Sequence, residues 1–417
     1  MKRWIACALL AVALAGCGHA GGGKKTVVFW QFWPSDTINP LIERFRAENP
    51  DLDVQVEQLT WQAGQEKIAA AVASGKVPDL VELGSTWFPA FAHQRALVDW
   101  TDSSAVLRDS LHLWDMASED GRVYGLPWLG GTRALFYNKT LFARAGIDSS
   151  KGPETWPELL EDCKRINALG KGVNGYGANS GERYVLFKKF MPYGWSNGGT
   201  ILSPDMKSVT FDSPQNVAAL KFYLSLADVG RVDHQALIDQ AFKQGNIGCV
   251  LTGAWLLKQI PADAPDLRYG VCMVPAPPGG KHLSFAGGEI LSTFQKSANP
   301  SGAWRLARFL TRAANASVIA QDQKSVQPAA VIASDDAYYA AHPGEKLFLD
   351  QLGSSVAPPN HPEWGRMEAA IETAVEQAMY RKITPEQAIT QAARELQAAL
   401  NSPQAASPAA TSPRAKG

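Results

Sequence analysis

Three tryptophans follow short apolar segments of this chain at similar positions. Trp33, Trp61 and Trp87 each come just after a segment that we predict to be a strand. A tryptophan at the mouth of a crevice offers a flat apolar face that suits the apolar face of a sugar ring, and neighbouring carboxylates and amides suit the hydroxyl groups of that ring. Each ring alone could simply cover the core, but three rings at equivalent places favour a shared site. The chemistry indicated is binding of a hydroxylated ring.

Polar side chains that could bind hydroxyl groups accompany these rings. Glu82 ends a predicted strand, and Glu289 follows two glycines that allow a ligand to approach the backbone closely. A carboxylate that accepts two hydroxyl groups makes stronger, charge-assisted hydrogen bonds than an amide does. Bracing of a hinge or capping of a helix would also account for such carboxylates. The candidates for hydroxyl binding are Gln65, Glu82, Arg133, Glu182 and Glu289. The candidates for stacking are Trp33, Trp61, Trp87, Trp128, Trp195 and Trp255.

Alternating segments of strand and helix character must position these residues. Residues 26–30 and 80–83 are apolar runs of strand length, and residues 54–56 alternate between apolar and polar. Asn39-Pro40 predicts the N-cap and first residue of a helix between the first two strands, and Ser74-Gly75 predicts the end of the next helix. This order predicts an open α/β sheet, in which ligands bind beyond the carboxyl ends of the strands.

The same alternation continues along the chain. We expect strands at 247–251 and 269–274, a helix that opens at Trp255, and further helices from Pro214, over 364–380 and over 385–400. A chain of 417 residues that is 46% hydrophobic is long enough for two domains, each with its own core.

The N-terminal residues predict export from the cytoplasm. Lys2 and Arg3 precede about ten mostly apolar residues, too few to cross a hydrocarbon core of ~30 Å. The following Leu14-Ala15-Gly16-Cys17 resembles the lipobox of bacterial lipoproteins, in which the cysteine is lipidated and anchors the protein to a membrane. The alternative is an ordinary signal peptide with a chance cysteine. We expect residues 1–16 to be the signal peptide, 17–25 a flexible tether, and the protein to act outside the cytoplasm.

Charge and cysteine content exclude several classes of function. The chain has 40 basic and 40 acidic residues without a basic stripe, so we expect no nucleic-acid partner. No CxxC or HExxH motif and no GxxxxGK[ST] loop occurs, so we expect no metal, no cofactor and no nucleotide hydrolysis. Beyond Cys17 the mature chain has Cys163, Cys249 and Cys272. The last two could pair, or all three could be buried free thiols.

A series of motifs identifies a family. The pattern YNK…LF…AGI…TW.EL over residues 137–159 resembles the extracellular solute-binding proteins of ABC sugar importers, the maltose-binding-protein-like family 1. Residues 77–84 resemble the VPD…E segment of that family, residues 241–255 its FKQG…GAW segment, and residues 284–289 its AGGE turn. The motifs occur in the order found in the family and extend through nearly all of the mature chain.

The resemblance implies an α/β protein of two lobes, each a mixed sheet flanked by helices, joined by a hinge that the chain crosses more than once. We place lobe I at 26–133 and 281–335, lobe II at 134–280 and 336–400, and a disordered tail at 401–417. A sugar, from mono- to oligosaccharide, would bind in the cleft. The closed protein, expected to be a monomer, would then dock on a membrane permease driven by a cytoplasmic ATPase. By analogy with the family, Trp255 is the strongest stacking candidate.

Two alternatives compete with a sugar receptor. Residues 194–198 match G-x-S-x-G, and Ser196 is followed by Asp233 and His282 in the order of an α/β-hydrolase, but Pro192 is poor for the strand that must precede the serine. A glycosidase would need two carboxylates roughly 5 to 9.5 Å apart, such as Glu82 and Glu289.

A third possibility keeps the binding function and changes the ligand to a phosphorylated polyol such as glycerol 3-phosphate. That ligand would call for several Arg or Lys residues in the cleft. Only Arg133 is evident from the sequence, so a neutral sugar is favoured.

Overall fold

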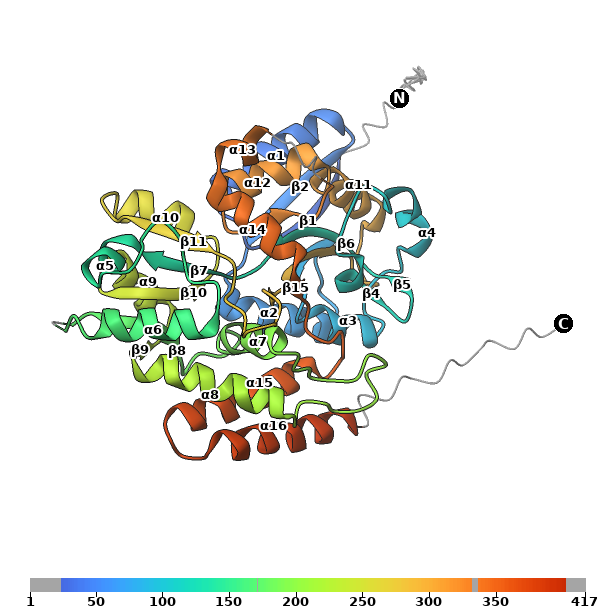
Figure 1. Cartoon of the computed structure of the whole chain (residues 1–417). Coiled ribbons are helices and arrows are strands. Elements are labelled where there is room, and N and C mark those ends of the chain that lie inside the picture. Colours follow the sequence, from blue (N-terminus) through green and yellow to red (C-terminus); the bar gives the residue numbers. More distant parts are fainter. Residues whose placement is uncertain (1–23, 171, 332–336, 403–417) are drawn as a thin grey trace, which may run out of the picture.

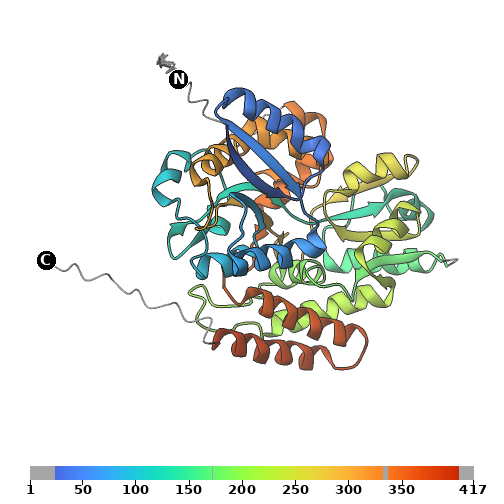
Figure 2. The same ribbon diagram turned by 180° about the vertical axis from the view of Figure 1, so that it is seen from behind.

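The computed structural model describes residues 24–170, 172–331 and 337–402. The predicted signal peptide, Cys17 and most of the predicted tail lie outside the described residues. Two large sheets flanked by helices dominate the described chain, and two further sheets have only two strands each, β12-β15 and β4-β5. One large sheet is surrounded by the blue and orange segments of Figure 1 and the other by the green and yellow segments, and Figure 2 shows the same two bodies from behind. The mixed α/β class expected from the sequence is confirmed.

The strands and helices have the following bounds. The strands are β1 (Lys25–Gln31), β2 (Leu52–Gln58), β3 (Leu80–Gly84), β4 (Ser118–Glu119), β5 (Arg122–Val123), β6 (Leu126–Gly131), β7 (Ala134–Asn138), β8 (Asn174–Asn179), β9 (Gly230–Asp233), β10 (Ile247–Thr252), β11 (Tyr269–Cys272), β12 (Ser284–Phe285), β13 (Gly287–Ser292), β14 (Gln327–Pro328) and β15 (Ser355–Val356). The α-helices are α1 (Ser35–Glu48), α2 (Trp61–Ser74), α3 (Phe88–His93), α4 (Thr101–Ser104), α5 (Lys139–Arg144), α6 (Trp156–Asn167), α7 (Phe187–Ser196), α8 (Pro214–Asp228), α9 (Gln235–Lys243), α10 (Leu256–Asp263), α11 (Pro300–Leu310), α12 (Ala313–Gln323), α13 (Ala337–Ala341), α14 (Pro343–Gly353), α15 (Trp364–Met379) and α16 (Pro385–Leu400). Two 3₁₀ helices are η1 (Ala105–Leu107) and η2 (Trp114–Ala117).

The first sheet has the strand order β14-β6-β13-β3-β1-β2. β1 runs parallel to β2 and β3, as the strand–helix alternation predicts, whereas β13 is antiparallel to β3 and β6. The predicted start of α1 was wrong, because the helix begins at Ser35 and contains Pro40. The carbonyl of Pro34 accepts from the backbone N–H groups of Thr37 and Ile38, which starts the helix before the Asn39-Pro40 pair.

The second sheet has the order β11-β7-β10-β8-β9. β7 is antiparallel to both β10 and β11 and lies between them, which separates Cys249 on β10 from Cys272 on β11. Strands two places apart lie about 9–10 Å apart, beyond the ~7 Å limit between the Cα atoms of a disulfide. These two cysteines and Cys163 are therefore free thiols.

Short segments lie side by side where the chain runs between the sheets. β6 of the first sheet continues into β7 of the second through Thr132 and Arg133. The Ser284 hydroxyl donates to the carbonyl of Arg133 at 2.7 Å and accepts from its N–H at 3.3 Å, and Thr132 Oγ1 lies 2.8 Å from Ser355 Oγ. Ser284 and Ser355 belong to the paired strands β12 and β15. Side-chain hydroxyls thus tie the segments of this junction together.

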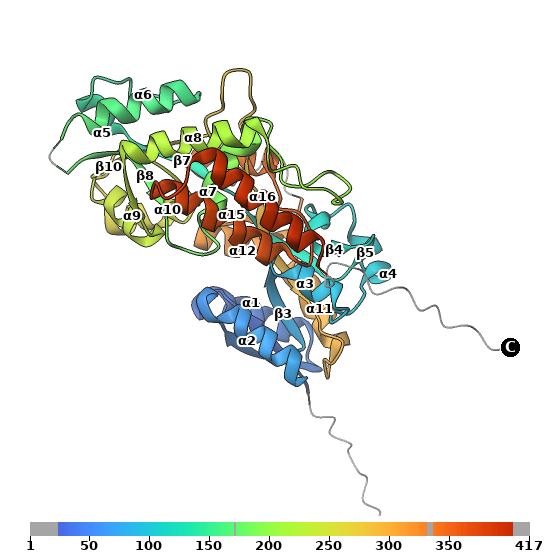
Figure 3. The same ribbon diagram turned by 90° about the horizontal axis from the view of Figure 1, so that it is seen from below.

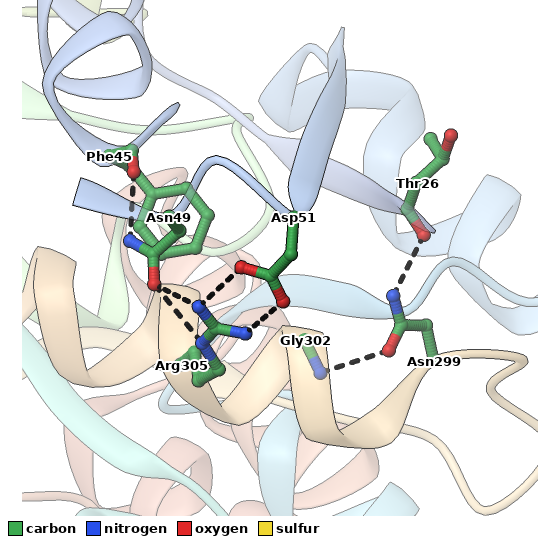
Figure 4. A network of polar contacts seen from close by, with 7 residues as sticks. All are labelled: Thr26, Phe45, Asn49, Asp51, Asn299, Gly302 and Arg305. Carbon is green, nitrogen blue, oxygen red and sulfur yellow. Dashed lines mark hydrogen bonds and ion pairs between the residues drawn. The ribbon is translucent and has the colours of Figure 1, made fainter. Parts of the chain in front are cut away.

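Residues from the later part of the chain fasten the start of the first sheet (Figure 4). Asn299 caps α11 by accepting from the N–H of Gly302 at 3.0 Å, and its amide donates to the carbonyl of Thr26 at 3.0 Å. Arg305 on α11 donates to both carboxylate oxygens of Asp51, at 2.7 and 2.9 Å. These contacts join segments more than 250 residues apart, so β1, β2 and α11 form one unit.

The helices over 364–380 and 385–400 predicted from the sequence are present as α15 and α16. They pack against each other and against α8, and Figure 3 shows the red pair lying along the green body. Side chains of α15 and α16 share a core with those of β7, α6 and α7. Within the described ranges, each helix is too short or too polar to cross a membrane.

Candidate functional site

A cavity of about 500 Å³ lies between the two bodies of the molecule. One side of the cavity is lined by residues that follow β1 and β3 and by the first residue of α2. The other side is lined by residues at or just before the starts of α7, α9 and α10. Seven of the eleven residues predicted for the site border this cavity. They are Trp33, Trp61, Trp87, Arg133, Glu182, Trp255 and Glu289.

Aromatic rings form the wall on the side of the first sheet. Phe32 and Trp61 stack with ring centres 4.1 Å apart and planes 13° apart, and Trp87 lies 5.2 Å from Trp61. Phe32 sits directly on the backbone of α2, because a Cβ on Gly64 would lie 2.4 Å from its ring. Trp61 is 42% exposed and offers its surface to the cavity. Trp61 follows β2, as expected, and is the first residue of α2.

Trp255 stands on the opposite wall, at the end of β10 and directly before α10. Its indole Nε1 donates to Asp239 at 2.8 Å, which fixes the orientation of the ring. The ring folds back over the preceding turn, where a Cβ on Gly253 would lie only 1.9 Å from it. A glycine at this place is therefore required by the position of the indole.

Arg133 lies beside Trp255 at the junction between β6 and β7. Its guanidinium is 5.0 Å from the centre of the Trp255 ring and 5.5 Å from that of Phe285, distances suited to cation–π attraction. Burial lowers the pKa of Arg133 to about 10, against the opposing attraction of Glu289 and Asp239. Its Nε is buried and has no hydrogen-bond partner among the described residues.

Two lysines at the start of α7 border the cavity and were missed by the sequence analysis. Lys189 is 2% exposed and donates to the carbonyl of Leu251 at 2.8 Å. Lys188 lies 5.3 Å from the centre of the Phe285 ring. Burial lowers the pKa of both ammonium groups. The signal that could have revealed them is a pair of lysines inside the apolar run Leu186-Phe187-Lys188-Lys189-Phe190, where a lysine must either face a cavity or be hydrogen-bonded.

Glu289 lies on β13 and borders the cavity. A register shift between Glu289 and Ile290 interrupts the pairing of β13 with β6 at this point. Burial raises the pKa of Glu289 to about 7, although the charges of Lys188 and Arg133 act in the opposite direction. Its Oε2 has no hydrogen-bond partner in the described part of the chain. The carboxylate is placed to accept a hydroxyl group.

Glu182 borders the cavity by the N-terminus of α9. Its Oε2 accepts from the backbone N–H of Gln235 at 2.7 Å, so the carboxylate braces the first turn of that helix. The other oxygen remains for a ligand, and Gln235 itself also lines the cavity.

Four of the predicted site residues do not border the cavity. Trp128 is fully buried in the core of the first sheet, where its Nε1 donates to the carbonyl of Leu310 at 3.2 Å. Trp195 is 6% exposed, packs against Phe187 and borders a different pocket. Glu82 is buried and accepts from the N–H of Phe32 at 2.8 Å, which places it behind the aromatic wall. Gln65 lies one turn along α2 from Trp61, outside the lining.

The geometry contradicts a serine hydrolase. Ser196 ends helix α7, whereas a nucleophile elbow places its serine between a strand and a helix. Its hydroxyl exchanges hydrogen bonds with the backbone of Leu283, at 3.1 and 3.2 Å. His282 Nδ1 is bonded to the carbonyl of Val274, and Asp233 accepts from Arg231. The three residues do not form a triad. The pairing of Glu82 with Glu289 for a glycosidase fails as well, because Glu82 is buried behind Phe32.

The raised pKa of Glu289 predicts a loss of stability as the pH rises. The folded protein holds this proton more tightly than the unfolded chain, so the free energy of unfolding should fall between about pH 4.5 and pH 7. Glu289→Gln should remove this fall and raise the free energy of unfolding at pH 8 by about 1–3 kcal/mol, with little change at pH 4.5. Urea unfolding at both pH values measures the difference.

A matched control for this prediction is Glu395→Gln, since Glu395 is exposed on α16. It should leave the pH dependence unchanged. An equal effect of Glu289→Gln at both pH values would show that packing, and not the charge of the carboxylate, is responsible.

The known proteins that this chain resembles are proteins that bind small solutes. The family model for bacterial extracellular solute-binding proteins matches residues 33–317. The chain is 24% identical over 410 residues to the galactooligosaccharide-binding protein of Bacillus subtilis, covering 93% of this chain and 94% of that one. It is 25% identical over 281 residues to the sn-glycerol-3-phosphate-binding periplasmic protein of Agrobacterium fabrum, covering 65% and 59%. Among solved structures, a solute-binding protein of an ABC transporter from Thermotoga lettingae bound to α-D-tagatose matches with a TM-score of 0.80 and 26% identity, covering 90% of this chain and all of that one.

Proposed function

Because the chain belongs to the bacterial extracellular solute-binding proteins, we propose that it captures a sugar in the cavity between its lobes and delivers it to an ABC permease for import. The observation that carries the proposal is a cavity with an aromatic wall on one side and charged hydrogen-bonding groups on the other. Aromatic faces suit the apolar face of a sugar, and the charged groups of Arg133 and Glu289, which border the cavity, suit its hydroxyl groups.

The relatives support a sugar as the ligand. The names of the Bacillus subtilis protein and of the Thermotoga lettingae structure both specify a sugar. The cavity volume of about 500 Å³ falls in the range of ordinary small-molecule sites and is compatible with a ligand of one or a few sugar rings. The proposed ligand-contacting residues are Trp33, Trp61, Trp87, Arg133, Glu182, Trp255 and Glu289.

We propose that lobe I comprises 26–133 with 281–335 and lobe II comprises 134–280 with 336–400. The composition of the two sheets supports this division, since β1, β2, β3, β6, β13 and β14 form one sheet and the strands β7 to β11 form the other. A ligand that touches both walls binds the closed arrangement better than the open one. A preference of about 10⁴-fold would turn a 1:99 ratio of closed to open molecules into 99:1.

The protein acts on the outer side of the cytoplasmic membrane in this proposal. A lipid on Cys17 would anchor the chain, and the tether that follows would leave the lobes free to meet the permease and its cytoplasmic ATPase. The protein binds as a monomer and releases the sugar unchanged, without catalysis. Extracytoplasmic action is supported by the family to which the chain belongs.

Calorimetric titration tests the proposed function. Protein purified with Cys17→Ala, so that no lipid is attached, is titrated with mono-, di- and trisaccharides, and the sugar is analysed afterwards. We expect saturable heat from one sugar class at 1:1 stoichiometry, with the sugar recovered intact. Slow continuous heat with consumption of the sugar would show an enzyme instead.

A further inference from the structure

The lining of the cavity differs in charge from the chain as a whole. The chain has 40 basic and 40 acidic residues. The cavity, however, is bordered by four cationic side chains and by only two acidic ones, Glu182 and Glu289. The four cations are Arg133, Arg183, Lys188 and Lys189. A site for a neutral ligand has no need of this excess of positive charge.

Arg133 and Lys188 are the central cations of this lining. Both lie against the ring of Phe285, with the guanidinium at 5.5 Å and the ammonium at 5.3 Å from its centre. Within the described ranges neither forms an ion pair within 4.0 Å, and the Lys188 ammonium has no hydrogen-bond partner. Each cation therefore lies near another of the same sign, half-buried and without a direct counter-ion.

Two of the carboxylates near these cations, Glu372 and Asp239, are hydrogen-bonded to other groups, whereas both oxygens of Glu368 lack a hydrogen-bond partner among the described residues. Glu372 accepts from the backbone N–H groups of Tyr184 and Phe187, at 3.0 and 3.2 Å. Asp239 accepts from the indole of Trp255. Glu368 attracts Lys188 from outside the lining, at more than ion-pair distance. These three carboxylates lie outside the lining, and Glu289 is the carboxylate of the lining that acts on both Arg133 and Lys188.

Resting on the proposed function, we propose that the imported sugar is acidic and that Arg133 and Lys188 hold its anionic group while its ring lies against Trp61 and Trp87. A guanidinium binds carboxylate or phosphate through paired hydrogen bonds, and an adjacent ammonium adds a second charge. An anion between the two would relieve their mutual repulsion. The ring distinguishes this ligand from an acyclic phosphorylated polyol, which would leave the aromatic wall without a partner.

Matched pairs of ligands test the charge of the sugar. The protein with Cys17→Ala is titrated with glucose and its acidic partners glucuronate and glucose 6-phosphate, and with galactose and galacturonate. Glycerol 3-phosphate is titrated as the acyclic phosphate. We expect an acidic sugar to bind at least about tenfold more tightly than its neutral partner. Tighter binding of the sugar phosphate than of the uronates would identify phosphate as the anionic group, and the reverse would identify carboxylate.

A charge variant tests the role of the lysine. Lys188→Met keeps the length and apolar character of the side chain and removes its charge. It should lower the ratio of acidic-sugar to neutral-sugar affinity by about 10- to 100-fold. The control, Lys221→Met, removes one charge from an exposed position on α8 outside the cavity and should leave that ratio unchanged. Thermal unfolding of each variant, followed by circular dichroism, shows that the ratios come from folded protein.

Two results would overturn the inference. Binding of a neutral sugar as tightly as its acidic partner would remove the need for an anionic group and leave the proposed function intact. Preferred binding of glycerol 3-phosphate over every ring-containing acid would exclude the role of the aromatic wall. A protein that binds neither neutral nor acidic sugars contradicts the proposed function itself, which makes the two failures distinguishable.

Discussion

Replacing Trp255 with alanine should weaken binding of the cognate sugar by about 100-fold, equivalent to about 2.7 kcal/mol. The change removes an aromatic face from the cavity wall. It also removes the ring against which the guanidinium of Arg133 rests at 5.0 Å and the donor that holds Asp239. Calorimetric titration of the variant measures the loss of affinity directly. We expect the weaker binding to come mainly from faster dissociation of the sugar.

Two further variants show which property of Trp255 matters. Trp255→Phe retains a ring and loses the hydrogen bond to Asp239, so its affinity should lie between those of the alanine variant and the unmodified protein. Trp114→Ala is the matched control, because Trp114 lies on η2 outside the cavity. An affinity of Trp255→Ala within about threefold of the unmodified protein would show that the ring only covers the core.

Replacing Trp128 with alanine should lower the free energy of unfolding by about 3–5 kcal/mol. The indole is fully buried, 6.3 Å from the ring of Phe29, and its Nε1 is bonded to the carbonyl of Leu310. The variant leaves a void between β6 and α11 and an unpaired carbonyl. Urea unfolding followed by circular dichroism measures the effect as a lower midpoint for the lobe that contains the first sheet.

The same variant decides between two roles for this residue. Trp128 is a predicted binding residue by sequence, whereas in the structure its indole lies in the core. Trp128→Phe fills most of the void and should recover more than half of the lost stability. A large loss of sugar affinity in Trp128→Ala, with an unchanged unfolding midpoint, would favour the binding role that the sequence suggested.

The order of strands and helices could be predicted because it depends on local patterns. The runs at 26–30, 80–83 and 247–251 are apolar and of strand length, and all three are strands in the structure. The start of α1 was misplaced because the Asn39-Pro40 pair has the usual chemistry of a helix start, while the carbonyl of Pro34 begins the hydrogen-bonded turn first. Local signals can compete, and only the folded chain shows which one prevails.

The site was predicted less completely, because it depends on which side chains from distant segments converge. Trp61 and Trp87 could be found from their places after strands. Trp128, by contrast, is the third residue of β6, a strand whose first five residues are all buried, and its indole belongs to the core. Lys188 and Lys189 were missed because a lysine pair is usually exposed, and nothing local shows that these two begin a helix beside the cavity.

The fastening of β1 has a mechanical consequence. β1 lies between β2 and β3, and both of these neighbours run parallel to it. A force applied at Lys25 along the strand would shear the hydrogen bonds to both neighbouring strands at once. The hydrogen bond from Asn299 to the carbonyl of Thr26 holds the first residues of β1 against the same force. Several hydrogen bonds must then break together, whereas peeling a strand from an edge breaks them one at a time. A protein held by its N-terminus would thus carry tension through the strongest direction of its first sheet.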